Sequence, residues 1–252
     1  MAPPALAVDR LTVRYGGVQA LDGLSMSVVA GELVGLIGPN GAGKTSAIDA
    51  ITGFTPSSGS VRLEGRDVHR EPPHRRAARG LARTFQGSEL FDDLDVLGNL
   101  LVAASRRRRW GVVTDLVRPG GRSTAGVSTA VDGALAALGI EHLRDEPIAA
   151  LSEGERKLVG LARALAGDPA VLLLDEPAAG LDTAESQALG ARLRAVADGG
   201  RAVVLVDHDV DLVLGICDAV HVLVRGGVIA SGPPAAVRND PAVIAAYLGT
   251  AA

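Results

Sequence analysis

The sequence has a single cysteine and very few aromatic residues. Cys217 has no second cysteine with which to form an internal disulfide, which is typical of a protein in a reducing compartment. We interpret it as a buried structural thiol. Aromatic residues make up 2% of the chain, too few for a surface that stacks single-stranded nucleic acid. The chain also has no excess of positive charge, since its net charge is −4. Proteins that bind nucleic acid are usually basic, so we expect no nucleic-acid partner.

Long apolar runs are also missing. None approaches the roughly 18 residues needed to span a bilayer, and the opening MAPPALAVDR has no charged-then-apolar leader. We therefore expect no transmembrane segment and no signal peptide, so that the chain reaches a membrane only by docking on another protein. Apolar residues nevertheless make up 47% of the 252 residues, enough for a sizeable core.

Short apolar runs alternate with helical patterns over much of the chain. Predicted strands with β-branched residues or period-two alternation are residues 6–13, 24–29, 33–38 and 60–65. The runs VLLLDE (171–176) and AVVLVDH (202–208) are continuous, as in parallel strands buried on both faces. Predicted helices are the segment after Lys44 and residues 183–197 and 209–216. The pattern indicates an α/β core with an antiparallel sheet near the amino terminus.

The middle of the chain has a different pattern. From about residue 87 to residue 150 the strand signals stop, and residues 92–104 and 128–140 have helical patterns. We interpret this part as a helical subdomain inserted into the α/β core. The tail is predicted to form two short helices separated by Pro241.

The stretch GPNGAGKT (38–45) fits the phosphate-binding pattern G-x-x-x-x-G-K-[ST] at every fixed position. It follows a predicted strand and precedes a predicted helix, which is the context that the pattern requires. Glycines let backbone N–H groups and the helix N-terminus face phosphate oxygens. Lys44 is expected to reach the β- and γ-phosphates, and the Thr45 hydroxyl to bind Mg²⁺. The predicted nucleotide-binding residues of this loop are Gly38, Pro39, Asn40, Gly41, Ala42, Gly43, Lys44, Thr45 and Ser46.

Two acids end the buried run 171–176. Asp175 is expected to hold Mg²⁺, directly or through water, and Glu176 to polarise the attacking water as a general base. Further along, LSEGERK (151–157) opens an apolar helical pattern, with Ser152 as the predicted helix cap and Glu155 three residues later in the capping-box position.

Together these motifs resemble the ATP-binding cassette (ABC) ATPases, and the resemblance covers nearly the whole chain. Other short matches occur in family order. By resemblance, Tyr15 stacks on adenine, and Gln86 is the Q-loop residue that senses Mg²⁺. Leu151, Ser152, Glu153, Gly154 and Glu155 form the signature loop, Asp182 lies in the D-loop, and His208 contacts the γ-phosphate. Catalytic roles then fall to Lys44, Glu176 and His208, and metal binding to Thr45, Gln86 and Asp175.

The resemblance implies a P-loop NTPase fold with a mixed core sheet, an N-terminal antiparallel β-subdomain and an inserted helical subdomain. Residues 1–252 would form one ATP-binding domain. Its expected parts are a core of about residues 1–86 and 151–231, a helical subdomain of about 87–150 and a tail of about 232–252.

The resemblance also implies a head-to-tail dimer in which the signature loop of one cassette meets the ATP held by the other. Ser152, the Gly154 amide and the helix dipole would then meet the partner's γ-phosphate. Glu153 stands where glycine is usual. Because a carboxylate beside a phosphate is unfavourable, we expect Glu153 to face outward, toward a basic residue.

Further stretches are similar to the importer ATPases for branched-chain amino acids, of the LivG type. These include ARTFQ followed by a phenylalanine, the insert before the signature helix and the ending RNDPAVIAAYLG (238–249). That branch implies ATP and Mg²⁺, a second identical or different cassette, two membrane permeases and, indirectly, an extracytoplasmic solute-binding protein. The chain would lie at the cytoplasmic face of the cell membrane, with branched-chain amino acids, small amides or urea as cargo.

Other functions remain as alternatives. The second-ranked reading is the ATPase of a lipopolysaccharide or lipid export system, and a soluble ABC ATPase acting on DNA or ribosomes fits less well. A non-hydrolysing cassette is disfavoured by Glu176 and His208. We interpret the arginine run at 106–109 as part of a solvated insert. The alternative is that it contacts anionic lipid headgroups or a permease loop.

Overall fold

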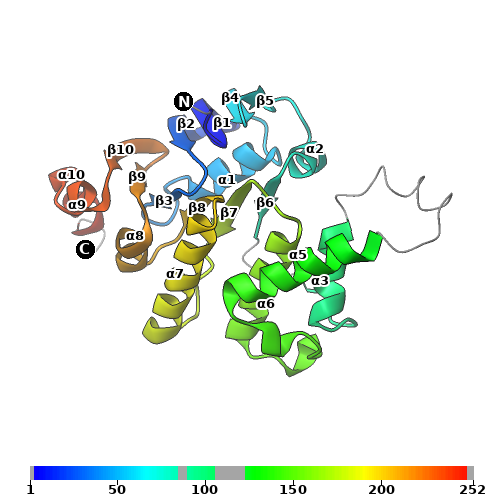
Figure 1. Ribbon diagram of the computed structural model, residues 1–252. Coiled ribbons are helices and arrows are strands. Elements are labelled where there is room, and N and C mark those ends of the chain that lie inside the picture. Colours follow the sequence, from blue (N-terminus) through cyan, green and yellow to red (C-terminus); the bar gives the residue numbers. More distant parts are fainter. Residues whose placement is uncertain (1–2, 85–89, 106–122, 249–252) are drawn as a thin grey trace. The chain divides into compact units, whose positions relative to one another are not determined.

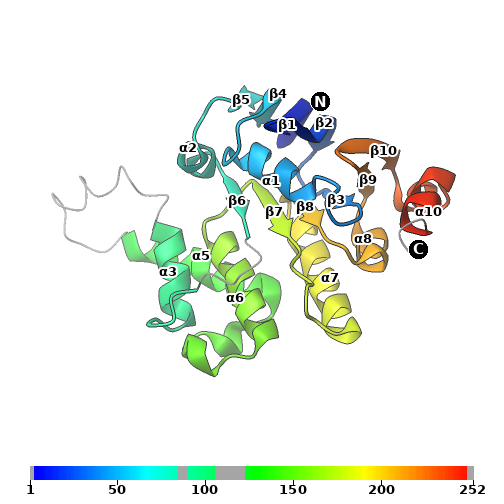
Figure 2. The same ribbon diagram turned by 180° about the vertical axis from the view of Figure 1, so that it is seen from behind.

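The computed structural model describes residues 3–84, 90–105 and 123–248, which divide into two compact units. The core unit combines Met1–Gln86 with Ala170–Ala252, and the helical unit is the continuous segment Gly87–Pro169. In the described ranges, all ten named strands belong to the core unit (Figures 1 and 2). The predicted α/β fold with a helical insertion is confirmed.

One sheet of the core unit is antiparallel, with the strand order β2-β1-β4-β5. Its strands are β1 (Leu6–Tyr15), β2 (Val18–Val28), β4 (Ser58–Leu63) and β5 (Arg66–Asp67). Leu6 and Val8 of β1 are buried, and the pairing register with β2 then shifts before Leu11. Arg10, with a left-handed φ of +47°, lies at this irregularity, and Leu11 returns to the buried face. The predicted N-terminal antiparallel sheet is thus confirmed.

The second sheet has the order β10-β9-β3-β8-β7-β6, and every neighbouring pair except β9 with β10 is parallel. Its strands are β3 (Leu33–Ile37), β6 (Leu81–Arg83), β7 (Val171–Asp175), β8 (Ala202–Val206), β9 (Ala219–Val224) and β10 (Gly227–Gly232). Every residue of β3, β7 and β8 is buried. The predicted continuous apolar runs are therefore confirmed as parallel strands covered on both faces.

Helix α1 (Lys44–Thr52) lies between the two sheets (Figure 1). Its Ile48 and Ile51 belong to one buried apolar cluster with Leu11 of β1 and Leu173 of β7. Because burial of one aliphatic side chain contributes roughly 1.5–3 kcal/mol, this cluster holds α1 against the strands on both sides.

The other helices of the core unit were predicted, except for the first of them. They are α2 (Pro73–Ala78), α7 (Thr183–Asp198), α8 (Val210–Ile216), α9 (Pro234–Arg238) and α10 (Pro241–Leu248). Helices α7 and α8 match the segments predicted at 183–197 and 209–216. Pro241 separates the two tail helices as predicted, and it is the first residue of α10, a position where its missing N–H costs nothing.

The helical unit contains α3 (Val96–Ser105), α5 (Ser123–Leu138), the 3₁₀ turns η2 (Glu141–Leu143) and η3 (Ile148–Ala150), and α6 (Glu153–Ala166). Helix α3 begins four residues later than predicted, because the Asp95 carboxylate accepts the Gly98 N–H at 2.6 Å and so caps the helix start. Helix α5 begins earlier than predicted, and it ends before Gly139, whose φ is +63°.

Helix α6 packs against α3 and α5, and the compact division places it in the helical unit. The sequence had assigned residues from 151 onward to the core. The apolar face of α6, which includes Val159, Leu161 and Ala162, is buried. The boundaries of the expected subdomains remain a prediction.

Helices long and apolar enough to cross a membrane do not occur in the three described ranges.

Candidate nucleotide-binding site

The glycine-rich loop joins β3 to α1 in the predicted strand–loop–helix arrangement. Two of its glycines are held tightly by neighbouring backbone. A Cβ on Gly38 would lie 2.2 Å from the carbonyl oxygen of Leu223 in β9, and one on Gly43 would lie 2.3 Å from that of Ala20 in β2. Gly43 also has a φ of +105°. Only glycine fits these two positions, so the loop is clamped between two strands.

The outer part of the same loop faces open space. Gly41 has a φ of +77°, and a Cβ there would have no atom within 4 Å. Gly43 is the N-cap of α1 and supplies no side-chain cap to the first helical turn. An uncapped helix N-terminus carries partial positive charge and N–H groups that suit an anion. The loop thus has the features of a phosphate cradle.

Lys44 bends back over the loop. Its side chain is 6% exposed, and Nζ donates to the carbonyl oxygens of Gly38 at 2.6 Å and Pro39 at 3.3 Å. Burial lowers the pKa of the Lys44 ammonium, while the carboxylates of Glu176, Asp175 and Asp207 act in the opposite direction. A cation held among acids and carbonyl groups is suited to meet an incoming phosphate.

Asp175 ends β7 and is 3% exposed. Burial raises the pKa of the Asp175 carboxyl, whereas the hydrogen bond from Arg83 lowers it. The Arg83 Nη2 donates to Oδ2 at 2.8 Å, and Oδ1 is buried without a hydrogen-bond partner in the described part of the chain. A buried acceptor oxygen left in this way fits the coordination of a cation such as Mg²⁺.

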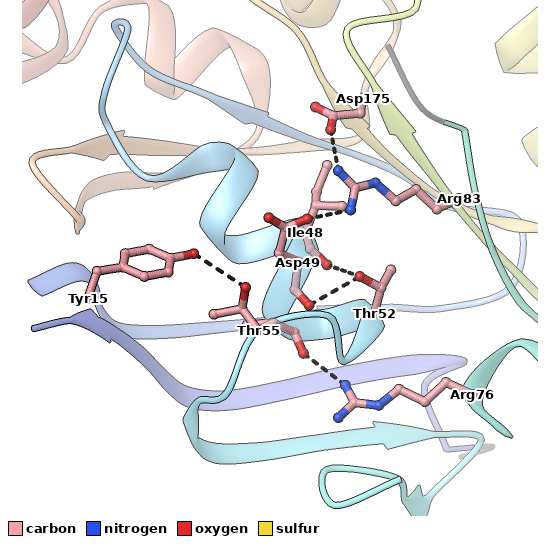
Figure 3. A network of polar contacts seen from close by, with 9 residues as sticks. Tyr15, Ile48, Asp49, Thr52, Thr55, Arg76, Arg83 and Asp175 are labelled. Atoms are coloured by element: carbon pink, nitrogen blue, oxygen red, sulfur yellow. Dashed lines mark hydrogen bonds and ion pairs between the residues drawn. The ribbon is translucent and has the colours of Figure 1, made fainter. Parts of the chain in front are cut away.

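Arg83, at the end of β6, joins two acids (Figure 3). Its Nη1 donates to the Asp49 carboxylate of α1 at 2.5 Å while Nη2 holds Asp175. The arginine therefore connects the helix after the phosphate loop to the strand that carries the predicted metal-binding acid. Sequence reasoning missed Arg83. In the sequence, Arg83 could have been noticed as a charged residue at the end of a strand, directly before TFQ.

Glu176 and His208 approach each other from the ends of β7 and β8. The His208 Nδ1 lies 4.0 Å from Glu176 Oε2 and 3.4 Å from Asp207 Oδ1. Glu176 has a left-handed φ of +50°, and its N–H donates to the Val206 carbonyl at 2.7 Å. Asp207, fully buried beside them, was also missed by sequence reasoning.

Tyr15, at the end of β1, is 49% exposed, and its hydroxyl lies 3.3 Å from Thr55 Oγ1. Figure 3 shows this contact beside the Arg83 network. Asp182 caps α7, because its carboxylate accepts the Glu185 N–H at 2.8 Å. Gln86 and the arginines at 106–109 lie outside the described residues.

The other predicted loop residues vary in exposure. Asn40, Gly41 and Thr45 are exposed, Ala42 is buried, and Pro39 and Ser46 are partly buried.

The predicted signature loop lies in the helical unit and forms the predicted capping box. Glu155 N–H donates to Ser152 Oγ at 3.3 Å, and Glu155 Oε2 accepts from the Ser152 N–H at 2.8 Å and hydroxyl at 2.7 Å. These hydrogen bonds lower the pKa of Glu155. Glu153 is 77% exposed and lies 3.7 Å from Lys157 Nζ, facing outward as expected. Leu151 and Gly154 are partly buried.

Comparison with known proteins agrees with this geometry. Residues 21–179 match the family described as ABC transporter, and residues 228–252 match the family described as branched-chain amino acid ATP-binding cassette transporter. The high-affinity branched-chain amino acid transport ATP-binding protein LivG of Salmonella typhimurium is 37% identical, with 100% of both chains covered.

Two further proteins are similar over nearly their full length. The lipopolysaccharide export system ATP-binding protein LptB of Haemophilus influenzae is 34% identical over 97% of each chain. A crystal structure of the ADP conformation of an ATP-binding cassette of an ABC transporter has a TM-score of 0.84 at 30% identity, covering 98% of this chain and 99% of that one. The chain therefore belongs to the ABC transporter family, as an ATP-binding subunit that hydrolyses ATP.

Proposed function

We propose that this subunit hydrolyses ATP at the carboxyl edge of β3, β8 and β7, and that it drives a branched-chain amino acid importer. The observation that carries the catalytic part is the convergence of four features at one sheet edge. The glycine loop follows β3, Asp175 ends β7, Glu176 follows it, and His208 follows β8. Because neighbouring parallel strands end together, these groups can act on one substrate.

The proposed chemistry is an in-line attack of water on the γ-phosphorus of ATP. Glu176 accepts a proton from the water while the bond between the γ-phosphorus and the bridging oxygen breaks, giving ADP and phosphate. Lys44 and the loop amides neutralise charge on the phosphate oxygens, and His208 donates a hydrogen bond to the γ-phosphate. Tyr15 holds the adenine by stacking.

Mg²⁺ fits the residues present. Thr45, Gln86 and Asp175 would hold it, partly through water. The Asp175 Oδ1, which has no hydrogen-bond partner among the described residues, is the observation that favours this. When bound, the ion would neutralise charge on the β- and γ-phosphates.

Substitution Glu176→Gln tests the catalytic assignment. It keeps the side-chain size but removes the proton acceptor, so we expect steady-state hydrolysis to fall by at least about 100-fold. Binding of ATP should stay within a few-fold of wild type. The matched control is Glu185→Gln, at an exposed helix cap in the core unit. Hydrolysis near the wild-type rate in Glu176→Gln would show that another group is the base.

The transport assignment is supported by the match of residues 228–252 and by the similarity to LivG. We infer a complex with a second cassette, identical or different, and two membrane permeases. An extracytoplasmic solute-binding protein would deliver the cargo, and the subunit would lie at the cytoplasmic face of the membrane. The similarity to LptB makes lipopolysaccharide export the second candidate.

Purification of the tagged chain from its native membranes, followed by identification of the bound proteins, tests this assignment. We expect two multi-span permeases and a cassette. Uptake of labelled leucine should stop in a strain that carries Glu176→Gln. Recovery of lipid-export components would favour the second candidate, and recovery of soluble partners alone would contradict both.

A further inference from the structure

Asp207 is a fully buried acid to which the sequence motifs assign no role. It follows the last residue of β8 and precedes His208. Burial of a carboxylate is costly unless hydrogen bonds compensate it. Three backbone N–H groups of other residues donate hydrogen bonds to the two carboxylate oxygens of Asp207. The side chain therefore acts as an acceptor on both of its oxygens.

These three hydrogen bonds connect two separate segments of the core unit. Oδ1 accepts from the N–H groups of His208 at 2.8 Å and Asp209 at 3.0 Å, both in the turn that leaves β8. Oδ2 accepts from the N–H of Ala178 at 3.2 Å, in the turn that leaves β7. One carboxylate thus joins the turn that carries His208 to the turn that carries Glu176.

The Glu176 turn is strained. A left-handed φ, here +50°, is unfavourable for a non-glycine residue and persists only where the surroundings hold it. Glu176 N–H donates to the Val206 carbonyl at 2.7 Å, and Ala178 N–H donates to the Asp207 carboxylate. The end of β8 therefore holds the chain on both sides of the strained residue.

We propose that Asp207 is a positioning residue that fixes the Glu176 carboxylate and the His208 ring relative to each other for ATP hydrolysis. The distance that it maintains is the 4.0 Å between Glu176 Oε2 and His208 Nδ1. The proposal rests on the proposed roles of Glu176 and His208, and it adds a group that touches neither substrate nor metal.

Asparagine is the smallest change that breaks this arrangement. Its side-chain amide has the shape of a carboxylate but only one acceptor oxygen, and its NH₂ group is a donor. Whichever way it is turned, the NH₂ faces either the Ala178 N–H or the pair of N–H groups in the His208 turn. Asp207→Asn should therefore release one of the two turns. Glutamate keeps two acceptor oxygens on a longer side chain.

The matched control is Asp218→Asn. Asp218 Oδ2 also accepts a backbone N–H, from Leu33 at 2.8 Å. Leu33 is the first residue of β3, whereas the glycine loop follows the last residue of β3. This contact therefore lies at the opposite end of the strand from the site. Asp218 Oδ2 also binds Arg194 Nη1 at 2.7 Å. Because asparagine keeps one acceptor oxygen, the control removes the charge of a carboxylate that accepts a backbone N–H in the same unit, without touching the site.

The experiment measures ATP hydrolysis, ATP binding and amide hydrogen exchange in the purified full-length chain. We expect Asp207→Asn to lower kcat roughly 10- to 100-fold, since a displacement of about 1 Å can cost that much. The dissociation constant for ATP should change less than about 3-fold, because the glycine loop is intact. Exchange should accelerate at Ala178 or at His208 and Asp209. Asp207→Glu should give an intermediate kcat, and Asp218→Asn a kcat near wild type.

Three outcomes would overturn the inference. One is wild-type kcat in folded Asp207→Asn, and another is an equal loss of kcat in Asp218→Asn, which would indicate general destabilisation. If Asp207→Asn does not fold, wild-type kcat in Asp207→Glu would be the third. Failure of the proposed function is distinguishable, because Glu176→Gln would then hydrolyse ATP at the wild-type rate whatever Asp207 does.

Discussion

Arg83 connects groups that are far apart in the chain. Its guanidinium is 9% exposed and binds Asp49 of α1 and Asp175 of β7, which is 3% exposed. Two acids that share one planar cation are held at a fixed separation. Removal of the cation would leave a buried carboxylate without compensation, which is far more costly than the loss of a surface ion pair.

We therefore expect Arg83→Gln to lower the free energy of unfolding by roughly 3 kcal/mol. The control is Arg79→Gln, which removes an arginine that also binds a carboxylate, Glu71, but in a more solvent-exposed pair. That substitution should cost clearly less than Arg83→Gln. Urea denaturation of both variants measures the difference. Equal losses would mean that the buried pair contributes no more than the exposed one.

Only some of the site could be predicted residue by residue. Gly38, Gly43 and Lys44 belong to a short continuous pattern whose chemistry requires those residue types. Arg83 and Asp207 act through partners that lie far away in the sequence, such as Asp175 and Ala178. A single arginine or aspartate beside a strand gives no sign of which backbone or side chain it will meet.

At the scale of elements, local capping patterns predicted helix starts well. Ser152 with Glu155 forms the predicted capping box at the first turn of α6, and the structure adds a second, unpredicted box, Asp182 with Glu185, at α7. The start of α3 was predicted too early, because DDLDVLGN contains several acids that could cap a helix and only the side chain of Asp95 accepts the Gly98 N–H. The strands that are buried on both faces were predicted from their continuous apolar runs, whereas β5, β6, β9 and β10 were not predicted.

The cap of α6 should depend on pH. The pKa of Glu155 is depressed in the folded chain by hydrogen bonds from Ser152. Its contribution is therefore fully present above the unfolded pKa, near 4.5, and is lost as pH falls through the lower folded value. Glu155→Gln keeps a neutral acceptor at this position, so it should remove this part of the acid sensitivity and cost less than about 1 kcal/mol at neutral pH.

Unfolding midpoints in urea, measured between about pH 6 and pH 3, test the cap. The control is Glu153→Gln, which removes an equal charge from the same turn but leaves the capping hydrogen bonds intact. An unchanged pH profile in Glu155→Gln would contradict the assignment.

For the whole molecule, the resemblance to ABC ATPases correctly predicted the α/β fold and the helical insertion. The boundary at the signature helix stays a prediction. Helix α6 is amphipathic, and its sequence does not reveal that the apolar face packs on α3 and α5. Cassette pairing likewise stays a proposal, because it depends on a second chain.

Pairing can be tested through the signature loop. Ser152→Arg places a bulky cation where the partner's γ-phosphate is proposed to lie, so cooperative hydrolysis should be abolished. Binding of ATP by the isolated chain should stay within about 3-fold of wild type, because the glycine loop is unchanged. Ser128→Arg, on the exposed surface of α5, is the control. Lost ATP binding in Ser152→Arg, measured by fluorescent nucleotide titration, would contradict the cross-dimer account.

The strand order also determines when the chain can fold during its synthesis. Leu33 of β3 pairs with Val203 of β8, and Val34 with Ala219 of β9, so β3 must wait for most of the chain before it gains either neighbour. The helical unit is continuous and leaves the ribosome complete well before that point. A ribosome-bound chain that ends before residue 202 would therefore carry the whole glycine loop yet leave both edges of β3 unpaired. Such an intermediate, apolar and incomplete, is the kind of substrate that chaperones bind.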